Sequence, residues 1–152
     1  MNILLIEDDE IKGGQLHDFI AQEYPHATLR WERSFSSGLR SIVSAETFDA
    51  LILDMSLPDN DLGEMDGSGE ETFAGRDLLS QMKFRGVSIP TVVVTMFDNF
   101  GKGESRVSLE ELGTSLTRQF SPMLRGVVYY SIAKEGWRAS LKKYLDVLKG
   151  GL

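Results

Sequence analysis

Four short apolar runs along the chain have the length and the β-branched content of buried strands. They are Ile3–Ile6, Ala50–Leu53, Thr91–Val94 and Val127–Tyr130. Their apolar residues follow one another without alternation, which is typical of strands covered on both faces in a parallel sheet. A fifth segment, Thr28–Arg33, alternates apolar and polar residues, so we expect it to be an edge strand.

The segments between and after these strands have helical spacing. Strands that alternate with helices predict βα units and a parallel sheet. Right-handed crossovers then favour a doubly wound α/β fold with helices on both faces. The apolar stripes, which we interpret as core packing, are Leu16, Phe19 and Ile20; Phe35, Leu39, Ile42 and Val43; Leu78, Leu79 and Met82; Leu109, Leu112, Leu116 and Phe120; and Trp137, Leu141, Tyr144, Leu145 and Leu148.

Two connections are longer than a compact domain usually has. The first, from Leu57 to Gly75, carries six acids and predicts an acidic insertion at about 59–74. The second predicts an extended segment at about 96–107. Both follow the carboxyl ends of strands, which is the edge where open α/β sheets bind ligands. We expect residues 1–152 to form one domain that carries both segments.

The amino-acid composition narrows the range of functions that the chain can have. A net charge of −7 disfavours direct binding of nucleic acid, because the phosphate backbone is itself negative. The chain has no cysteine, which excludes disulfides, thiolate metal sites and cysteine catalysis. No apolar run reaches the length of a membrane span, and the first residues lack the basic start of a signal peptide. We therefore expect a cytoplasmic protein without a membrane partner.

Acidic side chains follow the first and third predicted strands. Glu7 and Asp8 come directly after the first, and Asp54 comes directly after the third. If these strands are neighbours, the carboxylates crowd together, and a cation would compensate their charge. Oxygen ligands of this kind suit Mg²⁺ or Mn²⁺. A third carboxylate beside such a metal can attack a phosphoryl group, and the hydroxyl of Thr95, at the end of the next strand, could bind one of its oxygens.

Three segments, NILLIEDDE, FDALILDMSLPD and IPTVVVTMFD, resemble in order and spacing the leading motifs of response-regulator receiver domains. The resemblance covers the chain from Asn2 to about Leu148. It implies the flavodoxin-like fold with strand order 2-1-3-4-5, and phosphoryl transfer from a histidine kinase or a phosphotransfer protein. Asp54 matches the phospho-accepting aspartate, and Glu7 and Asp8 match the acidic pair that holds Mg²⁺. Ser56 matches the position whose backbone carbonyl binds the metal, and Thr95 matches the switch hydroxyl.

The sequence departs from the receiver pattern at several positions. Receivers carry a lysine at the end of the fifth strand, where this chain reads GVVYYSIAKEGW. Lys134 is the only lysine nearby. If Ser131 or Ala133 takes that position instead, the ion pair that couples phosphorylation to movement is missing. Met96 follows Thr95 where the family favours a small residue, and it could narrow access to Asp54. The acidic insertion and the longer fourth connection are further departures.

The leading interpretation is a single-domain receiver, a signalling module rather than an enzyme. It would accept a phosphoryl group on Asp54 with Mg²⁺ and signal by docking to another protein. The alternative is a pseudo-receiver that is not phosphorylated and acts only as a protein-interaction module. A third interpretation, a metal-dependent phosphatase similar to haloacid dehalogenases, is disfavoured. Such enzymes need an aspartate two residues after the nucleophile, where this chain has Ser56.

Overall fold

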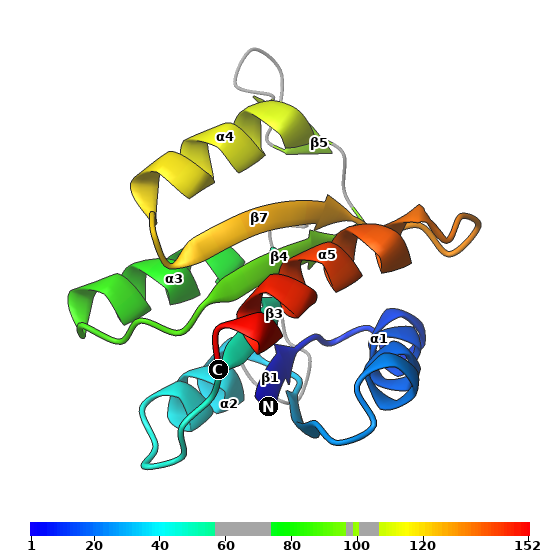
Figure 1. Cartoon of the computed structure of the whole chain (residues 1–152). Helices are drawn as coiled ribbons and strands as arrows, with labels where there is room; N and C mark the ends of the chain where they lie inside the picture. The colour runs from blue at the N-terminus through cyan, green and yellow to red at the C-terminus, as the bar shows by residue number, and fades with distance from the viewer. Residues whose placement is uncertain (57–73, 97–98, 101–106) are drawn as a thin grey trace.

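The computed structural model describes residues 1–56, 74–96, 99–100 and 107–152. Five parallel strands form one sheet with the order β2-β1-β3-β4-β7. Strands β1, β3, β4 and β7 can be followed in Figure 1. The bounds of the five strands are Asn2–Ile6 (β1), Thr28–Glu32 (β2), Ala50–Leu53 (β3), Thr91–Thr95 (β4) and Leu124–Tyr129 (β7). Since β7 is the fifth strand of this sheet along the chain, the predicted order 2-1-3-4-5 is confirmed.

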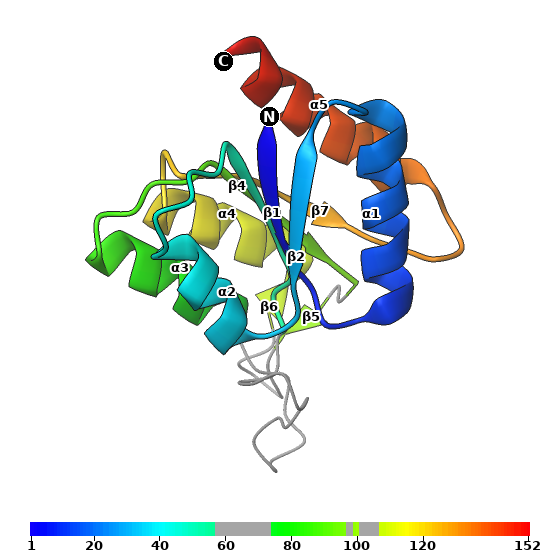
Figure 2. The same cartoon turned by 90° about the horizontal axis from the view of Figure 1, so that it is seen from below.

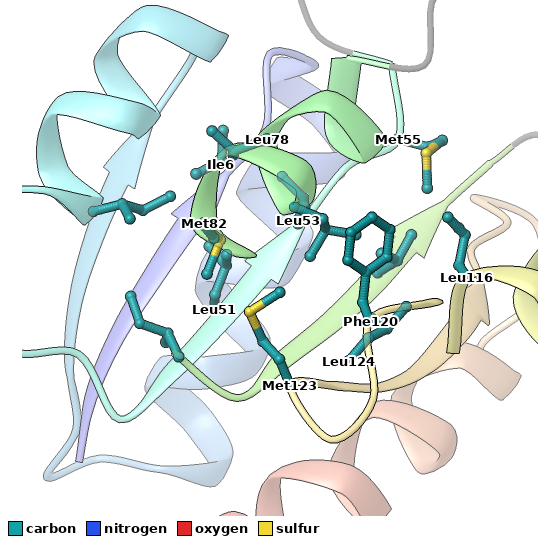
Figure 3. Close-up of a cluster of buried hydrophobic side chains, with 14 of the residues drawn as sticks. Ile6, Leu51, Leu53, Met55, Leu78, Met82, Leu116, Phe120, Met123 and Leu124 are labelled. Carbon is teal, nitrogen blue, oxygen red and sulfur yellow. The ribbon is translucent and has the colours of Figure 1, made fainter. Parts of the chain in front are cut away.

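Helices cover both faces of the sheet (Figure 2). The apolar residues of α1 (Glu10–Glu23) and α5 (Gly136–Gly150) pack in one buried cluster with alternate residues of the strands. Those of α2 (Phe35–Ile42), α3 (Ala74–Phe84) and α4 (Leu109–Gln119) pack in a second cluster on the opposite face. Figure 3 shows that second cluster, in which Leu51 and Leu53 of β3 lie among side chains from the helices and from the turn before β7.

The buried strands owe their position to the uninterrupted apolar runs. All four residues of β3 and all five of β4 are buried, so both faces of these strands are covered by helices. Strand β2 has the burial pattern of an edge strand, with no fully buried residue, and it pairs with β1 alone in the described sheet. The predicted central strands β1, β3 and β4 and the edge strand β2 are thus confirmed. The expectation that Val127–Tyr130 is covered on both faces was wrong, because β7 is the other edge strand and its burial alternates.

Side-chain caps fix where several helices begin. Asp9 caps α1, Ser34 and Ser37 form a capping box at α2, and the hydroxyl of Ser108 accepts a hydrogen bond from the backbone N–H of Glu111 at α4. No helix in the described ranges has both the length and the apolarity needed to cross a membrane.

The structure describes the two long connections to different extents. The predicted acidic insertion lies outside the described residues except for Ala74, which begins α3. Within the second connection, β5 (Asn99–Phe100) and β6 (Val107–Ser108) form a two-stranded antiparallel ladder next to α4. The sequence did not predict this ladder, because strands of two residues have no periodic pattern to detect.

Candidate phosphorylation site

The ends of β1 and β3 bring the predicted acidic residues together. The two strands pair in parallel, with Ile6 opposite Leu53, so the residues that follow them, Glu7 and Asp54, lie side by side. The backbone N–H of Asp54 donates to the carbonyl of Ile6 at 3.1 Å, which extends the ladder into the site. Neighbouring parallel strands therefore place these acids at one edge of the sheet, as the sequence predicted.

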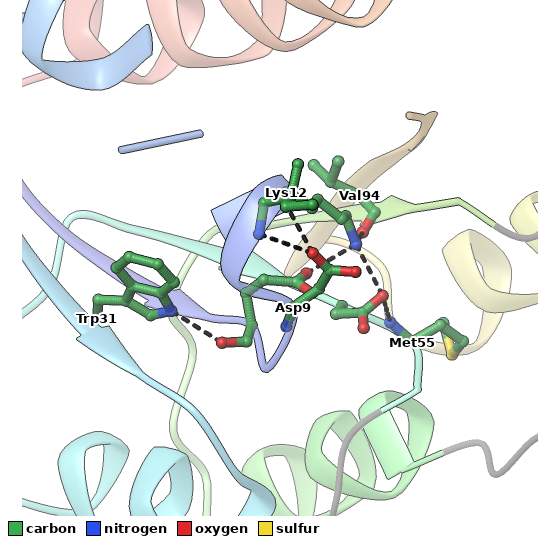
Figure 4. Close-up of polar contacts among 8 residues, drawn as sticks. Asp9, Lys12, Trp31, Met55 and Val94 are labelled. Carbon is green, nitrogen blue, oxygen red and sulfur yellow. Dashed lines mark hydrogen bonds and ion pairs between the residues drawn. The ribbon is translucent and has the colours of Figure 1, made fainter. Parts of the chain in front are cut away.

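The carboxylate of Asp54 is buried and held in place. Its Oδ1 accepts hydrogen bonds from the ammonium group of Lys12 and from the backbone N–H of Met55, both at 2.9 Å (Figure 4). Burial raises the pKa of Asp54, whereas the charge of Lys12 and the backbone N–H groups of Met55 and Ser56 lower it. Burial is the largest of these effects, so the pKa of Asp54 lies above its ordinary value.

Glu7 is buried beside Asp54 and shares its cation. Its Oε2 lies 2.7 Å from Lys12 Nζ, and its Oε1 accepts a hydrogen bond from the backbone N–H of Asp9 at 3.1 Å. Burial raises the pKa of Glu7 to about 8, the negative charge of Asp54 adds to this effect, and Lys12 opposes it. The indole N–H of Trp31 donates to the backbone carbonyl of Glu7 at 2.8 Å, which ties this strand end to β2 (Figure 4).

Asp8 completes a set of donors that fits a hard divalent cation. One carboxylate oxygen from each of Glu7, Asp8 and Asp54 lies within 4.8 Å of the others. Asp8 is exposed, whereas Glu7 and Asp54 are buried, so the cluster opens to solvent on the side of Asp8. Partial burial raises the pKa of Asp8, and the charge of Asp54 raises it further. Three clustered carboxylates are typical of Mg²⁺ and Mn²⁺ ligands.

Thr95 and Met96 lie at the end of the neighbouring strand. Thr95 is the last residue of β4 and is fully buried, and its carbonyl accepts a hydrogen bond from the backbone N–H of Tyr130 at 2.8 Å. Met96 is 36% exposed. It contributes to a cavity of about 300 Å³ that adjoins the site and is lined by Asp9, Ile11, Lys12, Met96, Tyr129, Tyr130, Ser131 and Ile132.

Comparisons with known proteins agree with this fold. The chain matches no protein-family model. It is 29% identical over 150 residues to the Detocs response regulatory protein DtcB of Enterobacter cloacae, covering 97% of this chain and 100% of that protein. It is 30% identical over 145 residues to the uncharacterized protein y4jR of Sinorhizobium fredii, covering 93% and 95% of the two chains. The solved structure of a response regulator receiver protein from Pseudoalteromonas atlantica superimposes with a TM-score of 0.68 at 14% identity, over 99% of this chain and 98% of that one.

This chain belongs to the response-regulator receiver family. The fold, the length of the curated relatives and the acids at the ends of β1 and β3 all agree with that assignment. Within this receiver domain, the assignments of Asp54 as phospho-acceptor, Glu7 and Asp8 as metal ligands, Thr95 as switch hydroxyl and the carbonyl of Ser56 as a further ligand remain predictions.

The lysine at the site is not the one that the sequence suggested. Lys134 lies in an exposed turn after β7, where its backbone bridges to Ser131. The residue directly after β7 is Tyr130, which is buried and packs against Trp137. The ammonium group on Asp54 belongs instead to Lys12 of α1.

Sequence reasoning missed Lys12, although the chain carries a signal for it. Lys12 precedes Leu16, Phe19 and Ile20 by four, seven and eight residues, which continues the apolar stripe of α1 by one turn. A lysine on the buried stripe of a helix needs an anionic partner, and Glu7, Asp8 and Asp54 were the evident candidates.

Proposed function

We propose that this receiver domain accepts a phosphoryl group on Asp54 from a phosphohistidine of a histidine kinase or phosphotransfer protein. The observation that carries the proposal is the buried Asp54 carboxylate, fixed by Lys12 and Met55 beside the two acids that follow β1. One oxygen of this carboxylate would attack phosphorus. The new O–P bond forms as the N–P bond breaks, and the histidine of the donor leaves as a neutral imidazole after taking up a proton.

We further propose that Glu7, Asp8, Asp54 and the backbone carbonyl of Ser56 hold Mg²⁺, or Mn²⁺ in its place. When bound, such an ion neutralises charge that develops on the transferring oxygens. Groups of the chain itself would orient the Asp54 carboxylate and bind the phosphoryl group. The N–H of Met55 orients the Asp54 carboxylate, and the hydroxyl of Thr95, at the neighbouring strand end, would bind a phosphoryl oxygen.

The surface next to the site supports docking of a protein donor. Ile11 and Ile132 line the adjoining cavity and are 61% and 65% exposed. Exposed apolar groups gathered at one place often mark protein contacts. The name of the Enterobacter cloacae relative, a response regulatory protein, supports the same kind of signalling here. We propose that the phosphorylated domain passes its signal to a further protein, without direct contact to nucleic acid or membrane, in the cytoplasm.

Chemical phosphorylation tests this function directly. Incubation with acetyl phosphate or phosphoramidate and Mg²⁺ should add one phosphoryl group, detected by intact mass, and hydroxylamine should remove it. Asp54→Asn should abolish the adduct. Asp18→Asn is a matched control, because the Asp18 side chain is 82% exposed on α1 and is not part of the cluster of Glu7, Asp8 and Asp54. Wild-type protein that stays unlabelled with both donors would refute the proposal in favour of an unphosphorylated interaction module.

A further inference from the structure

A lysine side chain lies in the core of this receiver domain. Lys12 is the third residue of α1, and its side chain is 1% exposed. Asp9 caps the helix, since its Oδ1 accepts hydrogen bonds from the backbone N–H groups of Ile11 and Lys12 at 2.9 and 3.0 Å. Lysine is almost never fully buried unless its charge is paired. The partners of the ammonium group therefore indicate what Lys12 does.

Three acceptors surround Lys12 Nζ. They are Glu7 Oε2 at 2.7 Å, Asp54 Oδ1 at 2.9 Å and the backbone carbonyl of Val94 at 2.6 Å. Figure 4 shows the ammonium group directed at these oxygens from α1. Because an ammonium group has three N–H donors, each acceptor takes one of them. Lys12 thus joins the ends of β1, β3 and β4 through one ammonium group, whose three N–H donors are all used.

Two of these acceptors also belong to the carboxylate set that fits a divalent cation. Mg²⁺ lies about 2.1 Å from its ligand oxygens, so an ion bound by Glu7 and Asp54 would use the carboxyl groups that Lys12 already contacts. The ion and the ammonium group would lie within a few ångströms of each other, where burial weakens the screening of their repulsion. Three carboxylates without Lys12 would present a more negative site to the metal.

We propose that Lys12 is a built-in competitor for the divalent metal of this site. Its ammonium group contacts Glu7 and Asp54, and its positive charge repels a divalent ion at the same oxygens and thereby weakens metal binding. The inference rests on the proposed function only in taking the cluster to be a metal site. A purely structural ion pair would affect stability, because removal of one partner leaves buried charge uncompensated. Removing a purely structural ion pair would not make metal binding tighter. A measurement of metal affinity therefore distinguishes a competitor for the metal from a purely structural ion pair.

The test is metal affinity in the full chain with and without the charge of Lys12. Lys12→Met keeps a side chain of similar length and removes the ammonium group. Calorimetric titration with Mg²⁺ and with Mn²⁺ should show that Lys12→Met binds the ion more tightly than wild type by about tenfold or more. The reason is that even a moderately screened cation a few ångströms away repels a divalent ion that strongly. Lys143→Met, at an exposed lysine of α5, should leave the affinity unchanged.

A second pair of variants covers the case in which Lys12→Met does not fold. Glu7→Gln is compared with Glu7→Gln combined with Lys12→Met, so that both proteins lack the same carboxylate and differ only in the ammonium group. The double variant should bind metal more tightly. Equal or weaker binding in the Lys12→Met member of either pair, where both proteins of that pair fold, would overturn the inference. Acetyl phosphate labelling of wild-type protein is scored separately, so failure of this inference and failure of Asp54 phosphorylation are distinguishable.

Discussion

Gly75 offers a sharp test of how α3 supports the phosphorylation site. It is the second residue of α3, and its N–H donates to the carbonyl of Met55 at 2.9 Å. A Cβ atom at this position would lie 2.9 Å from the Cα of Met55 and closer still to the carbonyl oxygen of Asp54. Both atoms are backbone, so they cannot rotate away as the end of a side chain could. Gly75→Ala must therefore displace the segment that carries Asp54.

The size of the effect follows from two opposing contributions. Overpacking of this kind costs about 1–3 kcal/mol. Alanine recovers up to ~1 kcal/mol through its higher helix propensity. We expect a net loss of about 1–2 kcal/mol in the free energy of unfolding, and a melting temperature lower by roughly 3–6 °C in a domain of this size. Urea unfolding followed by circular dichroism measures the loss.

Gly14→Ala is the matched control for this prediction. Gly14 lies within α1, and a Cβ there would have nothing within 4 Å. The same substitution should stabilise the protein by about 0.5–1 kcal/mol. Opposite signs at the two glycines would confirm that the start of α3 bears on the Asp54 backbone. A Gly75→Ala protein that gains stability as Gly14→Ala does would refute the reasoning.

Two further predictions concern charge and packing. Because the pKa of Glu7 is about 8 in the folded protein, Glu7 keeps a proton that the unfolded chain has released above its ordinary pKa. The free energy of unfolding, measured with urea in the presence of a chelator, should therefore fall as the pH rises from about 5 to 8, and Glu7→Gln should flatten that slope. The raised pKa values of Asp8 and Asp54 act in the same direction. Leu141→Ala, at a fully buried position of α5, should cost about 2–5 kcal/mol by the same assay, while Val147→Ala, at a residue 67% exposed, should cost far less.

Local patterns in the sequence were sufficient to predict the sheet and the acids at its edge. The bounds of β3 were predicted to the residue, because four consecutive apolar residues end at an aspartate. Once β1 and β3 are neighbours, the positions of Glu7 and Asp54 follow from parallel pairing without knowledge of any side-chain contact. This part of the site depends only on strand length and strand order.

The cation of the site could not be predicted in the same way. The receiver pattern predicted a lysine after the fifth strand of the sheet, where Lys134 is the nearest lysine. The register of β4 and β7, with Thr95 opposite Tyr129, places Tyr130 at the strand end and leaves Lys134 in the turn beyond. Lys12 lies 42 residues before Asp54, and their contact depends on how α1 packs across the sheet. The apolar stripe of α1 indicates only that Lys12 faces the core, and its contact with Asp54 follows from long-range packing.

The tyrosine that follows β7 and the lysine that α1 contributes to the site lie next to each other. Tyr130 occupies the position directly after β7 and is buried, with its hydroxyl donating to Gln15 Oε1 at 2.7 Å. Its ring centroid lies 6.0 Å from Lys12 Nζ, so the aromatic side chain fills space beside a charge that comes from α1. The carboxylate of Asp54 is consequently joined to α1 and to the end of β4 through Lys12, rather than to the segment after β7. Replacing Tyr130 with lysine alone would add a second cation next to Lys12, whereas an exchange of both residues would keep the charge of the site constant.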